Sequence, residues 1–206
     1  MGWVIIGCGA CIVPILWLVG GQRFLATSNR ISADVLIVEG WIGREAFKAA
    51  KDEFDRGGYR FLVATGGLTG EPWAEKRWSY AEIAQVEFVR LGVPAGVVVI
   101  ARSKESDRDR TYHNAAAALN QLRQEKIQPR GIQVFTRGLH TRRSGLVYER
   151  VFSEFTPVGV IGWQPENLEL TWWNSSHRAK DFLSESVAYF VERFRIMNRN
   201  TPESGE

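Results

Sequence analysis

The stretch Val35-Leu36-Ile37-Val38-Glu39-Gly40 decides the fold class of this chain. Four consecutive apolar residues, three of them β-branched, precede a carboxylate and a glycine. A continuous rather than alternating apolar run is typical of a strand that is covered on both faces, as in a parallel sheet. We therefore expect a buried parallel strand that ends in a polar turn.

Four similar apolar runs follow, and helical patterns separate them. The runs occupy residues 61–64, 97–100, 132–135 and 158–161, and the helical patterns lie near 44–56, 78–91, 111–125, 140–154 and 176–196. This alternation predicts an α/β fold, a Rossmann-like three-layer α/β/α sandwich with a mainly parallel five-stranded sheet. Ligands of such sheets bind beyond the carboxyl ends of the strands, at the topological switch point. The segments that follow the strands are therefore the expected site.

The beginning of the chain differs from the rest in composition. Residues 1–22 contain no charged side chain, although the whole chain of 206 residues has 26 Lys plus Arg and 23 Asp plus Glu. The uncharged run has the length that a helix needs to cross a bilayer, and it exceeds the apolar core of a cleaved signal peptide, which is the alternative. We predict a transmembrane anchor over 1–22, a juxtamembrane linker over 23–33, one α/β domain over 34–197 and a flexible tail over 198–206.

Composition also excludes several classes of chemistry. Both cysteines, Cys8 and Cys11, lie in the anchor, so the domain has no thiol nucleophile, zinc ribbon or redox pair. A net charge of +3 is too small to indicate nucleic-acid binding. No metal-ligand cluster is predicted, and the sequence identifies neither a cofactor nor a protein partner. The predicted partners are the membrane, through the N-terminal helix, and a small anionic or saccharide ligand.

The strongest candidate cluster follows the fourth strand and opens a helix. His140 and Arg143 meet there at a helix amino terminus, an arrangement that suits an anionic group such as phosphate or carboxylate. The alternative is merely a basic helix start. Positive charge at that end opposes the helix macrodipole, however, so a structural reason is harder to find.

Two further segments face the same predicted edge. Gly66 and Gly67 end the second strand, where glycines permit a ligand to approach the backbone closely or simply allow a tight turn. Neither a dinucleotide fingerprint nor a P-loop continues from them. Thr111 and Asn114 lie one helical turn apart after the third strand, and they face either the cleft or a solvated loop.

The order of the motifs resembles that of a known family. In chain order they are Asp34, Glu39-Gly40, Thr65-Gly66-Gly67, Ser79-Tyr80-Ala81-Glu82, Leu91-Gly92-Val93-Pro94, Thr111-x-x-Asn114-Ala115 and His140-x-x-Arg143-Ser144. Over residues 33–162 this resembles the SanA/ElyC/YdcF family of bacterial envelope-associated proteins. The resemblance implies a Rossmann-like domain behind a membrane helix and a role in envelope or peptidoglycan-precursor homeostasis. One branch of that family is associated with S-adenosylmethionine binding.

The resemblance and the residue chemistry together give a set of candidate site residues. The catalytic candidates are Glu39 and His140, and the substrate-binding candidates are Gly40, Gly66, Gly67, Ser79, Glu82, Thr111, Asn114 and Arg143. The first hypothesis is an enzyme that binds and processes a phosphorylated or lipid-linked envelope metabolite. The alternatives are a non-catalytic sensor or scaffold for an envelope synthesis complex, and a protein that binds S-adenosylmethionine or a nucleotide.

Two indications about the side of the membrane on which the domain lies disagree. Arg23 and Arg30 follow the apolar run, which by the positive-inside rule places the domain in the cytoplasm. The family resemblance implies a domain outside the bacterial inner membrane. We follow the resemblance and expect a single-pass protein with a periplasmic domain.

Overall fold

A five-stranded parallel sheet forms the centre of the protein. The computed structural model describes residues 15–69, 77–152, 156–165 and 171–199. The strands are β1 (Val35–Glu39), β2 (Phe61–Gly66), β3 (Val98–Arg102), β4 (Ile132–Arg137) and β5 (Val158–Trp163). Their order is β3-β2-β1-β4-β5, and all neighbouring pairs are parallel. The prediction of a Rossmann-like fold with a five-stranded parallel sheet is confirmed.

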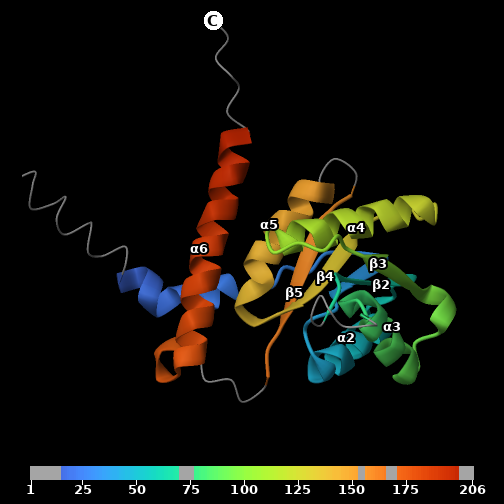
Figure 1. The fold of residues 1–206 in the computed structure, drawn as a ribbon, viewed down its shortest axis with the longest axis horizontal. Coiled ribbons are helices and arrows are strands. Elements are labelled where there is room, and N and C mark those ends of the chain that lie inside the picture. The colour runs from blue at the N-terminus through green and yellow to red at the C-terminus, as the bar shows by residue number, and fades with distance from the viewer. Residues whose placement is uncertain (1–14, 70–76, 153–155, 166–170, 200–206) are drawn as a thin grey trace, which may run out of the picture.

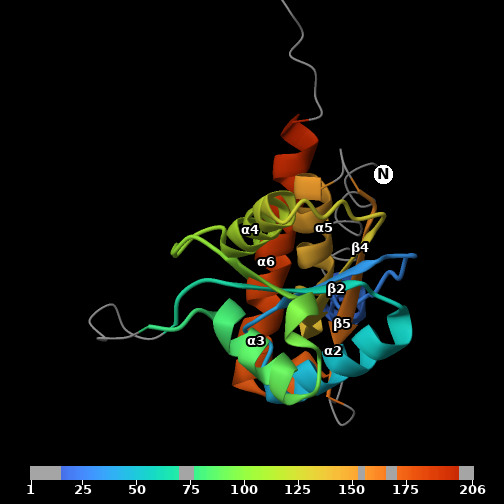
Figure 2. The same cartoon turned by 90° about the vertical axis from the view of Figure 1, so that its right-hand side faces the viewer.

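Two helices cover each face of the sheet (Figures 1 and 2). On one face α2 (Arg44–Gly57) and α3 (Tyr80–Arg90) pack on alternate strand residues such as Leu36 and Val38. On the other face α4 (Arg110–Gln124) and α5 (Thr141–Phe152) pack on residues such as Ile37. Because both faces are covered, all five residues of β1 are buried, which explains its continuous apolar pattern.

The last helix, α6 (Ser176–Arg199), lies outside these layers. It packs on α5 and on the N-terminal helix rather than on the sheet (Figure 1). Among the described residues there are also three short 3₁₀ helices, at Ala95–Val97, Gly138–His140 and Trp172–Asn174. α6 thus forms an additional layer on one side of the sandwich.

The N-terminal segment is folded against the domain. Residues 15–25 form a helix on which Trp17 contacts α6, its ring 4.8 Å from that of Phe190. The predicted linker over 23–33 lies beside the sheet edge, because the backbone groups of Asn29 and Val160 exchange two hydrogen bonds of 2.7 Å. Residues 1–14 of the predicted anchor and residues 200–206 of the predicted tail lie outside the described residues. Within the described part of the chain, no helix is both long and apolar enough to cross a membrane.

Asp34 joins the beginnings of three strands. Its buried carboxylate accepts hydrogen bonds from the backbone N–H of Arg130 (2.8 Å) and from the guanidinium of Arg60 (3.2 Å), just before β4 and β2. Burial raises the pKa of Asp34, but the hydrogen bonds from Arg130, Gly131 and Arg60 outweigh it and hold the pKa below its usual value. This first residue of the family-like motifs therefore has a structural role.

Substitution of Asp34 with asparagine is expected to reduce acid sensitivity as well as stability. The folded-state pKa is depressed, so the stabilisation is present above the unfolded-state pKa of about 3.9 and is lost as the pH falls through the folded-state pKa. We expect Asp34→Asn to lower the free energy of unfolding by about 1–2 kcal/mol at pH 7. On acidification, the free energy of unfolding should fall less in this variant than in the wild type. Urea unfolding followed by circular dichroism across acidic pH measures both, and Asp52→Asn, at an exposed position, is the control. A parallel pH dependence of wild type and Asp34→Asn would contradict this role.

Gly40 is a glycine because of close backbone packing. A Cβ atom there would overlap the carbonyl oxygen of Tyr80 and lie 2.8 Å from that of Thr65, which accepts a hydrogen bond from the Gly40 N–H. Both obstacles are backbone atoms, so the strand end or α3 would have to shift. We expect Gly40→Ala to cost about 2–3 kcal/mol of unfolding free energy, measured by urea denaturation. Gly96→Ala, where nothing lies within 4 Å of the added atom, is expected to change little, and equal effects of the two substitutions would refute the packing argument.

Candidate functional site

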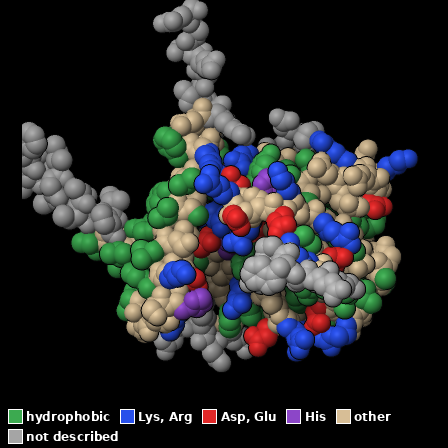
Figure 3. Space-filling model, in the orientation of Figure 1, with side chains coloured by type: hydrophobic (Ala, Val, Ile, Leu, Met, Phe, Trp, Pro, Cys, Tyr) green, Lys and Arg blue, Asp and Glu red, His purple; other side chains and the backbone are tan. Residues whose placement is uncertain are grey.

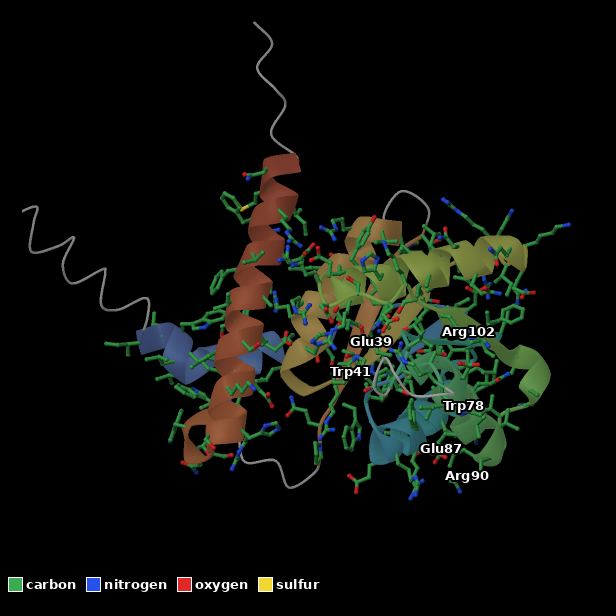
Figure 4. The ribbon with its side chains drawn as sticks, in the orientation of Figure 1. Glu39, Trp41, Trp78, Glu87, Arg90 and Arg102 are labelled. Atoms are coloured by element: carbon green, nitrogen blue, oxygen red, sulfur yellow. The ribbon has the colours of Figure 1, made fainter. Side chains whose placement is uncertain are left out.

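The candidate site lies at the topological switch point of the sheet. The chain winds outward in one direction from β1 through β2 to β3 and in the other from β4 to β5, so β1 and β4 are neighbours at the reversal. Glu39 ends β1, and Thr136 lies next to the end of β4. Glu39 and Trp41 are seen at this edge in Figure 4, whereas Glu87 and Arg90, near the end of α3, lie away from it. The position agrees with the rule that ligands of open α/β sheets bind beyond this reversal.

Glu39 is a fully buried carboxylate. Its exposed fraction is 0%, and its Oε2 accepts hydrogen bonds from the hydroxyls of Thr136 (2.5 Å) and Ser144 (3.3 Å). The phenol of Tyr148 is also buried, and burial together with the negative charge of Glu39 raises its pKa well above the usual range. Because two hydroxyls hold this buried carboxylate in place, it can stabilise a positive charge on a neighbouring group or accept a proton from it.

His140 is that neighbour. It ends the 3₁₀ turn Gly138–His140 directly after β4, and its Nε2 lies 3.7 Å from Oε2 of Glu39. The same nitrogen lies 3.3 Å from the hydroxyl oxygen of Thr111, in the first turn of α4. The indole ring of Trp41 packs against the imidazole at 5.0 Å, nearly perpendicular to it. The structure thus brings together residues from β1, α4 and the β4–α5 connection.

Glu185 of α6 completes the cluster from its outer side. Its carboxylate lies 2.9 Å from Nδ1 of His140 and accepts hydrogen bonds from Nε (2.8 Å) and Nη2 (3.1 Å) of Arg143. Burial raises the pKa of Glu185, but the hydrogen bonds and positive charge of His140 and Arg143 reverse this and hold the pKa far below its usual value. Arg143 also donates to Thr111 Oγ1 at 3.2 Å. Glu185 therefore orients both basic residues of the predicted cluster.

Sequence reasoning missed Glu185. The carboxylate lies 42 positions from Arg143 on a helix whose other residues show no motif. The one signal for it was indirect: two basic side chains at a helix start need a carboxylate partner when they are buried. The sequence shows that need but does not show which acidic residue meets it.

The hydrogen-bond roles at His140 follow from charge. Nδ1 lies near both the Glu185 carboxylate and Nη2 of Arg143, at 2.9 and 2.8 Å. A guanidinium only donates and a carboxylate only accepts, so Nδ1 cannot satisfy both neighbours. We assign the Nδ1 hydrogen to Glu185, which leaves Nε2 to exchange a proton with Thr111, Glu39 or a ligand. A hydroxyl, an imidazole and an orienting carboxylate in this order form an arrangement suited to proton transfer or hydroxyl activation.

The other predicted residues divide into two groups. Asn114 is buried one turn after Thr111, on the same face of α4. Ser79 and Glu82 instead form the capping box of α3, and Glu82 is paired with Arg102 at 2.6 Å. Gly40 and Gly66 lie against the start of α3, while Gly67 faces the loop at Ser103. The structure therefore gives a packing or capping role to the α3 side and concentrates the polar chemistry on the β4 side.

A separate hollow lies outside the cluster. It encloses about 340 Å³ between the end of β3 and α4, and its lining includes Arg102, Lys104, His113 and Asn120. The side chains of Glu39, His140 and Arg143 do not line it. Among the described residues, no group of three His, Cys, Asp or Glu side chains is placed to hold a metal ion.

Comparison with known proteins gives a distant likeness of fold. No protein-family model and no curated protein matches this sequence. A similar solved structure is the crystal structure of a bifunctional NMN adenylyltransferase/ADP ribose pyrophosphatase from Francisella tularensis, with a TM-score of 0.39 and 14% sequence identity. The match covers 68% of this chain and 42% of that chain, and it carries no argument about ligand or activity. The resemblance to the SanA/ElyC/YdcF family stays a prediction, and membership of the Rossmann-like α/β class is what the structure establishes.

Proposed function

We propose that this protein is an envelope protein of the bacterial inner membrane that binds and processes a phosphorylated or lipid-linked cell-envelope metabolite, with His140 as the group that transfers the proton during the reaction. The observation that supports this most strongly is the convergence of Glu39, His140 and Arg143 at the switch point. Arg143 and the Nε2 of His140 supply donors for an anionic oxygen. Glu39 stabilises positive charge on the imidazole, and Thr111 with Asn114 positions the ligand at the start of α4.

The membrane part of the proposal rests on the sequence. The charge-free run Gly2–Gly21 anchors the chain as a single-pass protein, and the domain lies on the periplasmic side. A carboxy-terminal alkaline phosphatase fusion tests the side directly, because that enzyme is active only in the periplasm. An inactive phosphatase fusion alongside a fluorescent green-fluorescent-protein fusion would place the domain in the cytoplasm and overturn this part.

Ligand binding is tested with defined probes on the full chain in detergent. Calorimetric titration would compare a polyprenyl phosphate, the matching polyprenol and inorganic phosphate. We expect binding of the polyprenyl phosphate, none of the polyprenol, and a loss of about 10–100-fold in affinity in Arg143→Gln, which removes charge-assisted hydrogen bonds worth about 1.5–3 kcal/mol. Arg108→Gln, at an exposed position on the loop before α4, is the control. Equal affinity for phosphate and alcohol, or an unaffected Arg143→Gln variant, would overturn the anion site.

A second candidate function is a non-catalytic sensor or scaffold for an envelope synthesis complex. It is favoured by the two hydrogen bonds that already join Arg143 to Glu185, because they satisfy the cluster without a ligand. The enzyme and scaffold hypotheses can be distinguished by mass spectrometry of polyprenyl phosphate and polyprenyl diphosphate after incubation with the protein. Binding without any change in mass, together with a stoichiometric protein partner that purifies with the full chain, would favour the scaffold.

A further inference from the structure

The outer surface of α6 and of the N-terminal helix is apolar. On α6 the exposed apolar residues follow a helical stripe: Leu183, Val187, Phe190, Val191, Phe194 and Met197. On the N-terminal helix they are Ile15, Leu16, Leu18 and Val19. Val19 and Val187 are 71% and 64% exposed. We call these ten side chains the apolar face, and Figure 3 shows hydrophobic side chains gathered along this flank of the molecule.

α6 carries apolar side chains on its exposed side as well as on its buried side, unlike a helix whose outer side faces only water. Toward the protein it buries Phe182 and Tyr189. On that side Glu185 also contacts His140 and Arg143, and Glu192 pairs with Arg150 at 2.7 Å. Its apolar stripe faces outward. An exposed apolar area that extends over two helices marks a surface that another apolar phase or partner covers.

The two helices present one continuous surface. They cross at Trp17, whose indole contacts Phe190 at 4.8 Å between ring centres and donates a 3.0 Å hydrogen bond to Ser186. In Figure 1 the N-terminal helix crosses α6, and its first described turn lies on the side of α6 away from the sheet. A plane that touches the outer side of α6 therefore meets the N-terminal helix as well.

The occupant of this surface follows from the sequence that precedes it. Ile15, Leu16, Leu18 and Val19 are the last part of the charge-free run Gly2–Gly21, whose length matches the hydrocarbon core of a bilayer. The apolar face thus continues directly into the segment proposed to enter the membrane. Exposed basic residues lie beside it, Arg23 on the N-terminal helix and Lys180 and Arg193 on α6, as expected for contact with anionic headgroups.

A second copy of the chain is the competing occupant. The spacing of Leu183, Val187, Phe190, Phe194 and Met197 also suits a helix–helix seam. A seam along α6 alone would leave the four residues of the crossing N-terminal helix exposed, however. A bilayer covers both helices at once, and this favours lipid.

We infer that α6 lies in the plane of the membrane surface, with its apolar stripe inserted among the lipids beside the N-terminal anchor. This inference rests on the anchoring that the proposed function includes. It adds that the helix that inserts also carries Glu185, which orients His140 and Arg143. The ligand site is then held at headgroup level, within reach of a lipid-linked phosphate.

Site-specific fluorescence tests the inference on the full chain. The domain has no cysteine, so Val187→Cys and Phe194→Cys can be labelled singly with an NBD fluorophore in a Cys8→Ser, Cys11→Ser background. The protein is reconstituted into vesicles of equal parts phosphatidylcholine and phosphatidylglycerol, with or without lipids that carry a doxyl quencher near the headgroup. We expect a blue-shifted emission at both positions and loss of most of the fluorescence with the quencher, because in-plane helices insert about 5–10 Å.

Two further labels make the outcome decisive. Gln124→Cys, at the end of α4, is expected to stay unquenched and solvent-like. The native Cys11, labelled in a Cys8→Ser chain, reports the anchor independently of α6. A blue-shifted Cys11 label with solvent-like labels at 187 and 194 would overturn this inference while leaving the anchor intact. Labels at 187 and 194 that are shielded from doxyl lipids, together with disulfide-linked dimers of the unlabelled Val187→Cys and Phe194→Cys chains, would assign the apolar face to a second copy and would also overturn the inference.

Discussion

Replacement of Glu185 with alanine is expected to lower the free energy of unfolding by about 3 kcal/mol, the cost of removing one partner from a largely buried ionic cluster. The exposed fractions of the side chains of His140, Arg143 and Glu185 are 12%, 18% and 19%, so the basic groups would lose their main partner with little water to replace it. α6 would also lose its central polar contact with α5. Urea unfolding of the full chain in detergent, followed by circular dichroism, measures the change.

The pH dependence distinguishes this role from simple packing. The pKa of Glu185 is depressed in the folded state, so its stabilisation is complete above the unfolded-state value of about 4.3 and is lost as the pH falls through the folded-state value. The stability deficit of Glu185→Ala should therefore shrink as the pH falls below about 4. Glu185→Gln should lie between wild type and alanine, and Ser184→Ala, at an exposed neighbouring position on α6, should behave as wild type. A deficit that is constant from pH 7 to strong acid would show that Glu185 acts by packing alone.

Replacement of Glu39 with glutamine is expected to lower turnover by about 100-fold or more, since positioned acid–base groups contribute about 10²–10⁴-fold. The change keeps the shape of the side chain and an oxygen that can accept from Thr136 or Ser144. It removes the negative charge 3.7 Å from Nε2 of His140, which would otherwise stabilise the imidazolium. The substrate for this measurement is whichever probe the wild-type protein converts in the mass-spectrometric test.

Comparison of the turnover number with the ligand affinity of Glu39→Gln should show whether the Glu39 charge acts in the reaction or in binding. We expect the turnover number to fall while the affinity for polyprenyl phosphate, measured by calorimetry, changes little, because Arg143 is the residue proposed to contact the anion. Glu45→Gln, at an exposed position in the first turn of α2, is the control. Full turnover by Glu39→Gln would show that the Glu39 charge has no catalytic role. The scaffold function would then be the better explanation of this cluster.

The arrangement of the site shows where sequence reasoning succeeds. Parallel strands all end at one edge of a sheet, whatever the details of packing. The sequence therefore allows one common site to be predicted for Glu39, Thr111, His140 and Arg143. Their separations of 3.2–3.7 Å come from the tertiary structure, in which β1 and β4 are neighbours. The sequence did not distinguish a capping role from a ligand-binding role for Ser79 and Glu82, because a capping box and a ligand site use the same residue types.

The N-terminal region shows the opposite case. A run without charge predicts burial in an apolar phase, yet it does not distinguish lipid from another helix. Trp17, Phe24 and Leu25 pack on α6 through contacts with Phe182 and Tyr189, and no periodicity in residues 15–25 identifies these partners. Docking of that helix depends on the shape of a surface formed more than 150 residues later in the chain.

The sequence by itself therefore determined the layered α/β fold and placed Glu39, Thr111, His140 and Arg143 in segments that follow the strands, because the apolar pattern of each strand and helix is a local property of the chain. Only the tertiary structure decided that the switch point lies between β1 and β4, that Glu185 completes the cluster, and that α6 exposes a second apolar stripe besides the buried Phe182 and Tyr189. The physical reason is that a charge partner is selected by distance in space, and an amphipathic helix has the same sequence pattern whichever of its sides faces the protein.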